Sequence, residues 1–121
     1  MVITLFGRIP SKKNSKIILC RRNRPLLISN PKYQEWETEQ LWVLKDNQIR
    51  KHFPRKINSM ELKFFFPDLR KTDLSNKTES VMDLLVKSEL IEDDNYTIVP
   101  ILNLIYGGVD KVKPRVEITF Y

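Results

Sequence analysis

The chain has 121 residues, 41% of them hydrophobic and 30% charged, and it carries a net charge of +6 at pH 7. This length and balance predict one globular domain over residues 1–121 and exclude a disordered chain. A membrane span and an internal disulfide are not expected, because every apolar run falls far short of the roughly 20 residues that cross a bilayer and Cys20 is the only cysteine. The N-terminus has no signal-peptide pattern, so we expect a cytoplasmic protein.

Apolar periodicity and turn residues predict an alternation of strands and helices. In chain order we expect a strand over residues 2–9, a short hairpin from residues 17–19 and 26–28, a helix from about 30 to 51, a strand over 60–66, a helix over 74–90, and strands over 98–106 and 115–121. Tyr33, Trp36, Val43 and Leu44 are the expected apolar face of the first helix. The order predicts an α+β fold, a mixed sheet covered by two main helices.

Positive charge is concentrated in the first 34 residues, which hold eight lysines and arginines and no acid, whereas the rest of the chain has 13 cations and 15 acids. Such segregation is typical of a protein that binds a polyanion with one part and acts on it with another. Lysine and arginine neutralise phosphates and release counterions. Candidate phosphate contacts are Lys12, Lys13, Asn14, Lys16, Arg21, Arg22 and Arg24. A solubilising surface loop is the alternative.

Acidic residues gather around the second predicted helix. Asp73 directly precedes it, Glu79 and Asp83 lie on its polar stripe, and Asp93-Asp94 follow its C-terminal end. Carboxylates are the ligands that Mg²⁺ prefers, and Mg²⁺ supports phosphodiester hydrolysis. Because a helix over residues 74–90 is about 25 Å long, Asp73 and Asp94 meet only if the chain then folds back along the helix.

The same acids have ordinary structural interpretations. An acid at a helix N-terminus interacts favourably with the helix dipole, acids on a polar stripe are usually solvated, and Asp-Asp-Asn is common in turns. However, Glu89, Glu92 and the Asp93-Asp94 pair lie close to a helix C-terminus, which disfavours carboxylates. Locally unfavourable charge is a pointer to function, so both interpretations stay open.

Three motifs in order resemble the signature of the RusA-type Holliday-junction resolvases, which runs Asp-x-Asp-Asn, Asp-x-Leu, Asp-Asp. The matching stretches are Pro67-Asp68-Leu69-Arg70-Lys71-Thr72-Asp73-Leu74-Ser75-Asn76, Val81-Met82-Asp83-Leu84-Leu85 and Ile91-Glu92-Asp93-Asp94. The opening strand and the following Ile9-Pro10-Ser11-Lys12-Lys13-Asn14 are also similar to the start of that family. The resemblance covers nearly the whole chain.

The resemblance implies a Mg²⁺-dependent endodeoxyribonuclease, for which Mn²⁺ can substitute. Proteins of this kind are homodimers, often encoded by prophages, that resolve four-way DNA junctions by paired nicks in recombination and repair. We therefore expect branched DNA as the partner and the cytoplasm of a bacterial or phage-infected cell as the location. Lys71 and Lys77 join the candidate DNA contacts.

Two positions depart from the family pattern. Ser75 replaces a motif carboxylate, and Glu79 stands where the family carries a lysine. We hypothesise that the two changes compensate each other, so that the metal ligands are Asp73, Glu79, Asp93 and Asp94. Asp83 completes the catalytic set, either as a ligand or behind the ligands, and assistance by a lysine falls to Lys77, to Lys71 or to neither. The alternatives are a non-catalytic DNA-binding protein on the same scaffold, and a nuclease for flaps or other branched nucleic acid.

Overall fold

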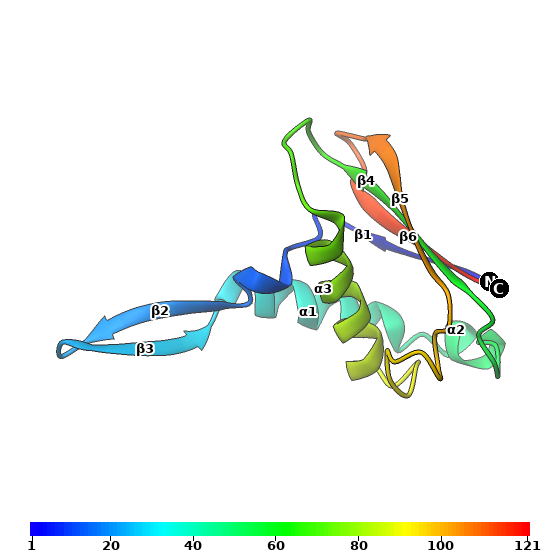
Figure 1. Ribbon diagram of the computed structural model, residues 1–121, viewed down its shortest axis with the longest axis horizontal. Helices are drawn as coiled ribbons and strands as arrows, with labels where there is room; N and C mark the ends of the chain where they lie inside the picture. Colours follow the sequence, from blue (N-terminus) through cyan, green and yellow to red (C-terminus); the bar gives the residue numbers. More distant parts are fainter.

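The computed structural model describes residues 1–121 and has an α+β architecture (Figure 1). Its elements in chain order are β1 (Val2–Phe6), the 3₁₀ turn η1 (Lys12–Asn14), β2 (Lys16–Arg21), β3 (Arg24–Ser29), α1 (Pro31–Leu44), α2 (Asn47–His52), β4 (Met60–Phe66), α3 (Leu74–Lys87), β5 (Leu102–Val109) and β6 (Arg115–Phe120). Four strands form one sheet in the order β1-β6-β4-β5, in which β4 and β5 are parallel and the other neighbours antiparallel. The predicted α+β fold with a mixed sheet is confirmed. None of the α-helices combines the length and apolarity that crossing a bilayer requires.

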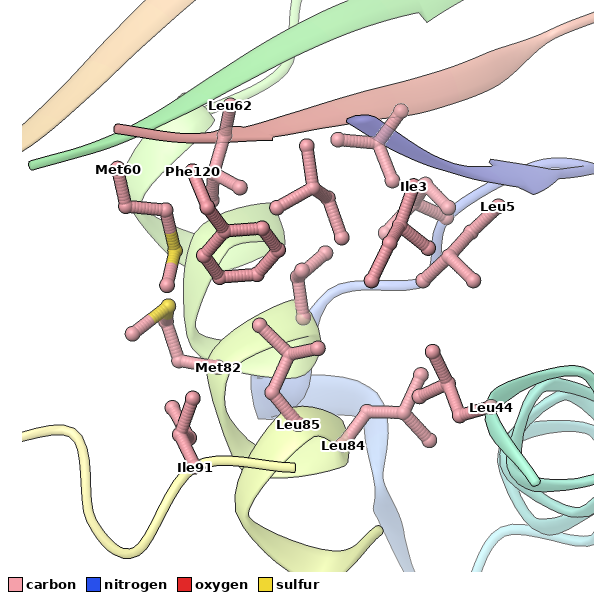
Figure 2. Packing of buried hydrophobic residues seen from close by; sticks show 14 of the residues in the cluster. Ile3, Leu5, Leu44, Met60, Leu62, Met82, Leu84, Leu85, Ile91 and Phe120 are labelled. Carbon is pink, nitrogen blue, oxygen red and sulfur yellow. The ribbon is translucent and has the colours of Figure 1, made fainter. Parts of the chain in front are cut away.

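The main core lies between this sheet and the helices (Figure 2). Alternate residues of a strand point to the same face, and in β4 Met60, Leu62 and Phe64 are fully buried on the face that meets α3. Met82, Leu84 and Leu85 of α3 belong to the same cluster, in which Met82 faces Met60 and Leu84 lies toward Leu44 of α1, and the whole cluster contains 19 buried residues. Helix α3 is therefore fixed against the sheet along its apolar face, which orients its polar face.

Strands β2 and β3 form a separate hairpin that projects from the body of the molecule (Figure 1). Its strands pair from Lys16↔Ser29 to Arg21↔Arg24. Arg22 and Asn23 have φ values of 51° and 60°, as the central residues of a two-residue type I′ turn require. The predicted hairpin with arginines at its tip is confirmed.

The helix predicted to reach residue 51 breaks near residue 45. Helix α1 ends at Leu44, and Asp46 caps the short α2 by accepting a hydrogen bond from the Gln48 N–H at 2.8 Å. Asp and Asn bond readily to nearby backbone, which favours a new helix start over continuation. Val43 is exposed, against the prediction, while Gln40 is buried and donates to the Phe6 carbonyl.

Helix α3 ends at Lys87, three residues earlier than predicted, because Glu89 adopts φ of 63° and cannot continue a right-handed helix. Strand β5 begins at Leu102 and not near residue 98. The Asn95 carbonyl accepts from the N–H groups of Ile98 and Val99, so this segment is a turn and its backbone is unavailable to the sheet.

Candidate active site and nucleic-acid interface

Asp73 is the N-cap of α3, at the end of the β4–α3 loop. Its Oδ1 accepts hydrogen bonds from the Ser75 hydroxyl at 2.8 Å and from the Ser75 N–H at 3.0 Å, and its Oδ2 accepts from the Asn76 amide at 3.3 Å. The bonds from Ser75 hold the pKa of Asp73 below its ordinary value. Ser75 thus orients the Asp73 carboxylate.

The remaining predicted acids do not join Asp73. Glu79 is exposed and makes no ion pair or side-chain hydrogen bond. Asp93 and Asp94 lie in an exposed loop beyond the C-terminal end of α3, at the opposite end of the helix from Asp73 (Figure 1). Since 14 residues of helix extend about 21 Å, the chain does not make the return along the helix that a shared site needs. No three acidic, histidine or cysteine side chains of the chain gather to hold a metal ion.

The Asp93 carboxylate is occupied by its own turn. Its Oδ1 accepts from the Asp94 N–H at 2.7 Å and its Oδ2 from the Asn95 amide at 2.8 Å. These bonds, the one from the Asp94 backbone first, lower the pKa of Asp93. In a single chain, the arrangement is the ordinary turn that the sequence left open as an alternative.

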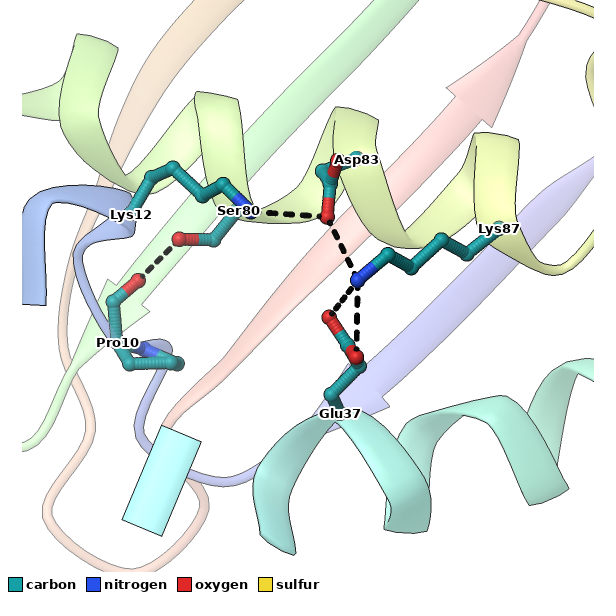
Figure 3. Close-up of polar contacts among 6 residues, drawn as sticks. All are labelled: Pro10, Lys12, Glu37, Ser80, Asp83 and Lys87. Carbon is teal, nitrogen blue, oxygen red and sulfur yellow. Dashed lines mark hydrogen bonds and ion pairs between the residues drawn. The ribbon is translucent and has the colours of Figure 1, made fainter. Parts of the chain in front are cut away.

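Asp83 belongs to a network of ion pairs (Figure 3). The Lys12 ammonium lies 3.1 Å from Asp83 Oδ2, and Lys87 lies 3.6 Å from the same oxygen and 3.0 Å from Glu37. The hydrogen bond to Glu37 is the main cause of the raised pKa of Lys87. Asp83 thus links α3 to the N-terminal segment through Lys12, and Lys87 links α3 to α1 through Glu37.

Helix α3 fastens the basic N-terminal segment at three successive points of one face. The Lys77 ammonium donates to the Ile9 carbonyl at 2.6 Å, the Ser80 hydroxyl donates to the Pro10 carbonyl at 2.7 Å, and Asp83 pairs with Lys12. Spacings of three residues place these side chains in line along a helix. The polar stripe predicted on this helix thus faces the segment around Pro10 as well as solvent.

A cavity of about 470 Å³ lies between the N-terminal segment, the start of α1 and the β4–α3 loop. We call it the basic cavity, because five of its lining residues are cations and one is an acid, Asp68. The cations are Arg8, Lys32, Arg70, Lys71 and Lys77. Burial first, and then the charges of Arg8 and Lys13, lower the pKa of Lys77. The charge of Lys13 also contributes to the lowered pKa of Asp73, so the cavity and the carboxylate share one electrostatic environment.

The predicted DNA contacts divide into two groups. Asn14, Lys71 and Lys77 line the basic cavity, with Lys12 and Lys13 beside it on η1. Lys16 and the three arginines of the hairpin tip lie on the projecting hairpin, where they are exposed and make no ion pair. One end of the molecule therefore presents two basic surfaces.

The sequence did not single out Arg70, and it placed Arg8 and Lys32 among the eight cations of the first 34 residues without naming them as site residues. The available signal was position: Arg70 precedes Lys71 in the loop that ends at Asp73, and Arg8 precedes the Ile-Pro-Ser-Lys-Lys-Asn motif. Only the fold shows that these cations line one cavity.

Cations that line a cavity beside an ionised carboxylate are typical of proteins that act on phosphodiesters. A family model described as endodeoxyribonuclease RusA matches residues 9–121, and the chain belongs to this family. It is also similar to the crossover junction endodeoxyribonuclease RusA of Aquifex aeolicus (strain VF5), with 23% identity over 113 residues, which cover 89% of this chain and 87% of the relative.

Proposed function

We propose that the protein is an endodeoxyribonuclease that resolves four-way DNA junctions by paired nicks. Its family and the name of its Aquifex relative support this function. The observation that carries the proposal is the position of Asp73, an ionised carboxylate on the same loop as two cations of the basic cavity, Arg70 and Lys71. Phosphate binding and phosphodiester chemistry would thus share one edge of the molecule.

The side chains around Asp73 suit particular steps of such a reaction. Ser75 holds the pKa of Asp73 below its ordinary value, and the carboxylate contributes negative charge next to the cations. Arg70 and Lys71 neutralise phosphates of the DNA strand beside Asp73. Lys77, fixed on the Ile9 carbonyl, supplies a positioned positive charge.

The family resemblance implies Mg²⁺, but the residues of one chain do not fit a Mg²⁺ site. No three candidate ligands converge, and the oxygens of Asp73 and Asp93 already accept hydrogen bonds from their neighbours. A ligand set of Asp73, Glu79, Asp93 and Asp94 therefore requires an arrangement that this single chain does not adopt. Calorimetric titration with Mg²⁺ or Mn²⁺, with and without DNA, tests it.

A homodimer is the expected assembly, since two active sites related by a two-fold axis match a junction that has two-fold symmetry. Sedimentation of the free protein across a concentration range tests this part of the proposal. A species of one chain at all concentrations, together with cleavage that is first order in protein, would contradict it.

Cleavage of a substrate panel tests the proposed function. A synthetic four-way junction, a flap, a single-stranded RNA and a duplex with the sequence of one junction arm are each incubated with the protein and Mg²⁺. The proposal predicts paired nicks in the junction and an intact duplex. Preferred cleavage of the flap or of RNA would assign the site to another branched or single-stranded substrate, and binding of the junction without cleavage in Mg²⁺ or Mn²⁺ would show a DNA-binding protein that is not a nuclease.

A further inference from the structure

The basic cavity has an excess of positive charge that the protein does not balance. Of its five cations, Arg8 has an acidic partner, Asp68, at 3.6 Å. Lys77 has only the Ile9 carbonyl as a hydrogen-bond partner, and Lys32, Arg70 and Lys71 form no ion pair. Like charges lining one cavity repel one another and attract an anion.

Two residues of the cavity wall also carry buried polar atoms. Tyr33 and Trp36, on successive turns of α1, are 4% and 8% exposed. The Trp36 indole N–H makes no hydrogen bond, while the Tyr33 hydroxyl lies beside the Ser80 hydroxyl, which itself donates to the Pro10 carbonyl. A buried donor without an acceptor is costly and rare, and the Trp36 N–H is such a donor in the wall of the cavity.

The location of the cavity relates its ligand to Asp73. Thr72 and Lys77 line the cavity, while Asp73 itself does not. A phosphate held among the cations would therefore lie beside the carboxylate and not against it, which avoids repulsion between two anions. The next phosphate of the same strand can then approach Asp73.

We propose that the basic cavity binds one phosphate of a nucleic-acid strand and so positions the neighbouring phosphodiester at Asp73. Arg8, Arg70 and Lys77 are the principal contacts, and Trp36 lies in the wall behind them. That the neighbouring phosphate is the one cleaved rests on the proposed function; the binding of a phosphate in the cavity does not. Free phosphate shares this chemistry, so the test compares both sources.

The Trp36 indole N–H offers a direct spectroscopic test. The chain has two tryptophans, and Trp42 is 71% exposed, with the Lys45 ammonium over its ring at 4.7 Å. In ¹H–¹⁵N spectra of the full chain, assigned with Trp42→Phe, we titrate a short oligothymidylate and, separately, inorganic phosphate. The proposal predicts that the oligonucleotide shifts the Trp36 indole signal to saturation while that of Trp42 stays in place, and that inorganic phosphate shifts Trp36 in the same direction more weakly.

Charge-removing variants provide the second readout. The double variant Arg8→Gln, Arg70→Gln should abolish the Trp36 shift and lower the slope of log affinity against log salt by about 0.7, the value for one phosphate of a single strand. Between 50 and 200 mM salt, this corresponds to about a 2.6-fold smaller loss of affinity. The matched control, Lys51→Gln with Lys56→Gln, removes two exposed cations of α2 and the following loop and should leave the Trp36 shift unchanged.

Two results would overturn the assignment. The first is an unmoved Trp36 signal while anisotropy shows that the oligonucleotide is bound. The second is a Trp36 shift with inorganic phosphate and none with the oligonucleotide, which would make the cavity a site for a small anion. Neither result depends on cleavage. If the oligonucleotide binds in the cavity but the protein does not nick junctions, the proposed nuclease function is contradicted and this inference stands.

Discussion

The bond between Ser80 and the Pro10 carbonyl makes a specific prediction about the basic segment. Ser80 is fully buried, and its hydroxyl is the only hydrogen-bond donor to that carbonyl. Ser80→Ala leaves the carbonyl without its partner, which costs about 1–3 kcal/mol for a buried group. Because Pro10 is only half-buried and water can approach, we expect about 1–2 kcal/mol, or a urea midpoint lowered by about 0.5–1 M.

The assay combines urea unfolding with amide hydrogen exchange. The Asn14 N–H bonds to the carbonyl of Ser11, the N-cap of η1, and the Ser15 N–H to the carbonyl of Lys12, both at 3.0 Å, so their exchange reports whether this segment stays ordered. Ser80→Ala should speed their exchange. The matched control is Thr78→Val, which removes a buried hydroxyl that bonds only to the Leu74 carbonyl of the same helix.

Thr78→Val should leave both η1 amides protected and lower the urea midpoint less. If Ser80→Ala had no larger effect than Thr78→Val on both the midpoint and the exchange, the idea that α3 fastens the basic segment would be refuted.

Three further predictions concern the core, the basic segment and the acidic site. Leu84→Ala, at a fully buried position, should cost about 2–5 kcal/mol in urea unfolding, and a smaller loss would mean that α3 packs loosely. Lys13→Ala should lower the salt slope of duplex binding by about 0.9, whereas Lys12→Ala should change it less because Lys12 already pairs with Asp83; equal slopes for both variants would contradict this. Ser75→Asp should raise the pKa of Asp73, measured by NMR titration, since it replaces a hydrogen-bond donor with a like charge; an unchanged or lower pKa would contradict the orienting role of Ser75.

Much of the fold follows from local pattern. The alternation over Met60–Phe66 identifies β4, and the apolar face of Leu74–Lys87 identifies α3. The position of Asp73 at a helix start can be predicted from the sequence because capping is a local interaction. The hairpin is equally local, since its turn needs only two residues that accept positive φ.

The arrangement of the site is less predictable, because it depends on contacts between distant segments. Periodicity indicates that Asp83 lies on the polar side of α3, but not that Lys12 meets it there. The path after the helix is decided by Glu89 in a left-handed conformation and by the Asn95 turn, and it leaves Asp94 far from Asp73. The cations of the basic cavity likewise come from four segments, the N-terminal segment, α1, the β4–α3 loop and α3, which only the fold brings together.

Single-turnover cleavage of a four-way junction by the wild-type protein and by Asp73→Asn tests most directly whether Asp73 is the centre of a nuclease site. Binding is measured in parallel with Ca²⁺ in place of Mg²⁺. The account predicts paired nicks by the wild type, loss of cleavage in Asp73→Asn by at least two orders of magnitude, roughly the value of one catalytic charge, and binding that is retained or stronger. Equal cleavage rates in the two proteins would contradict it.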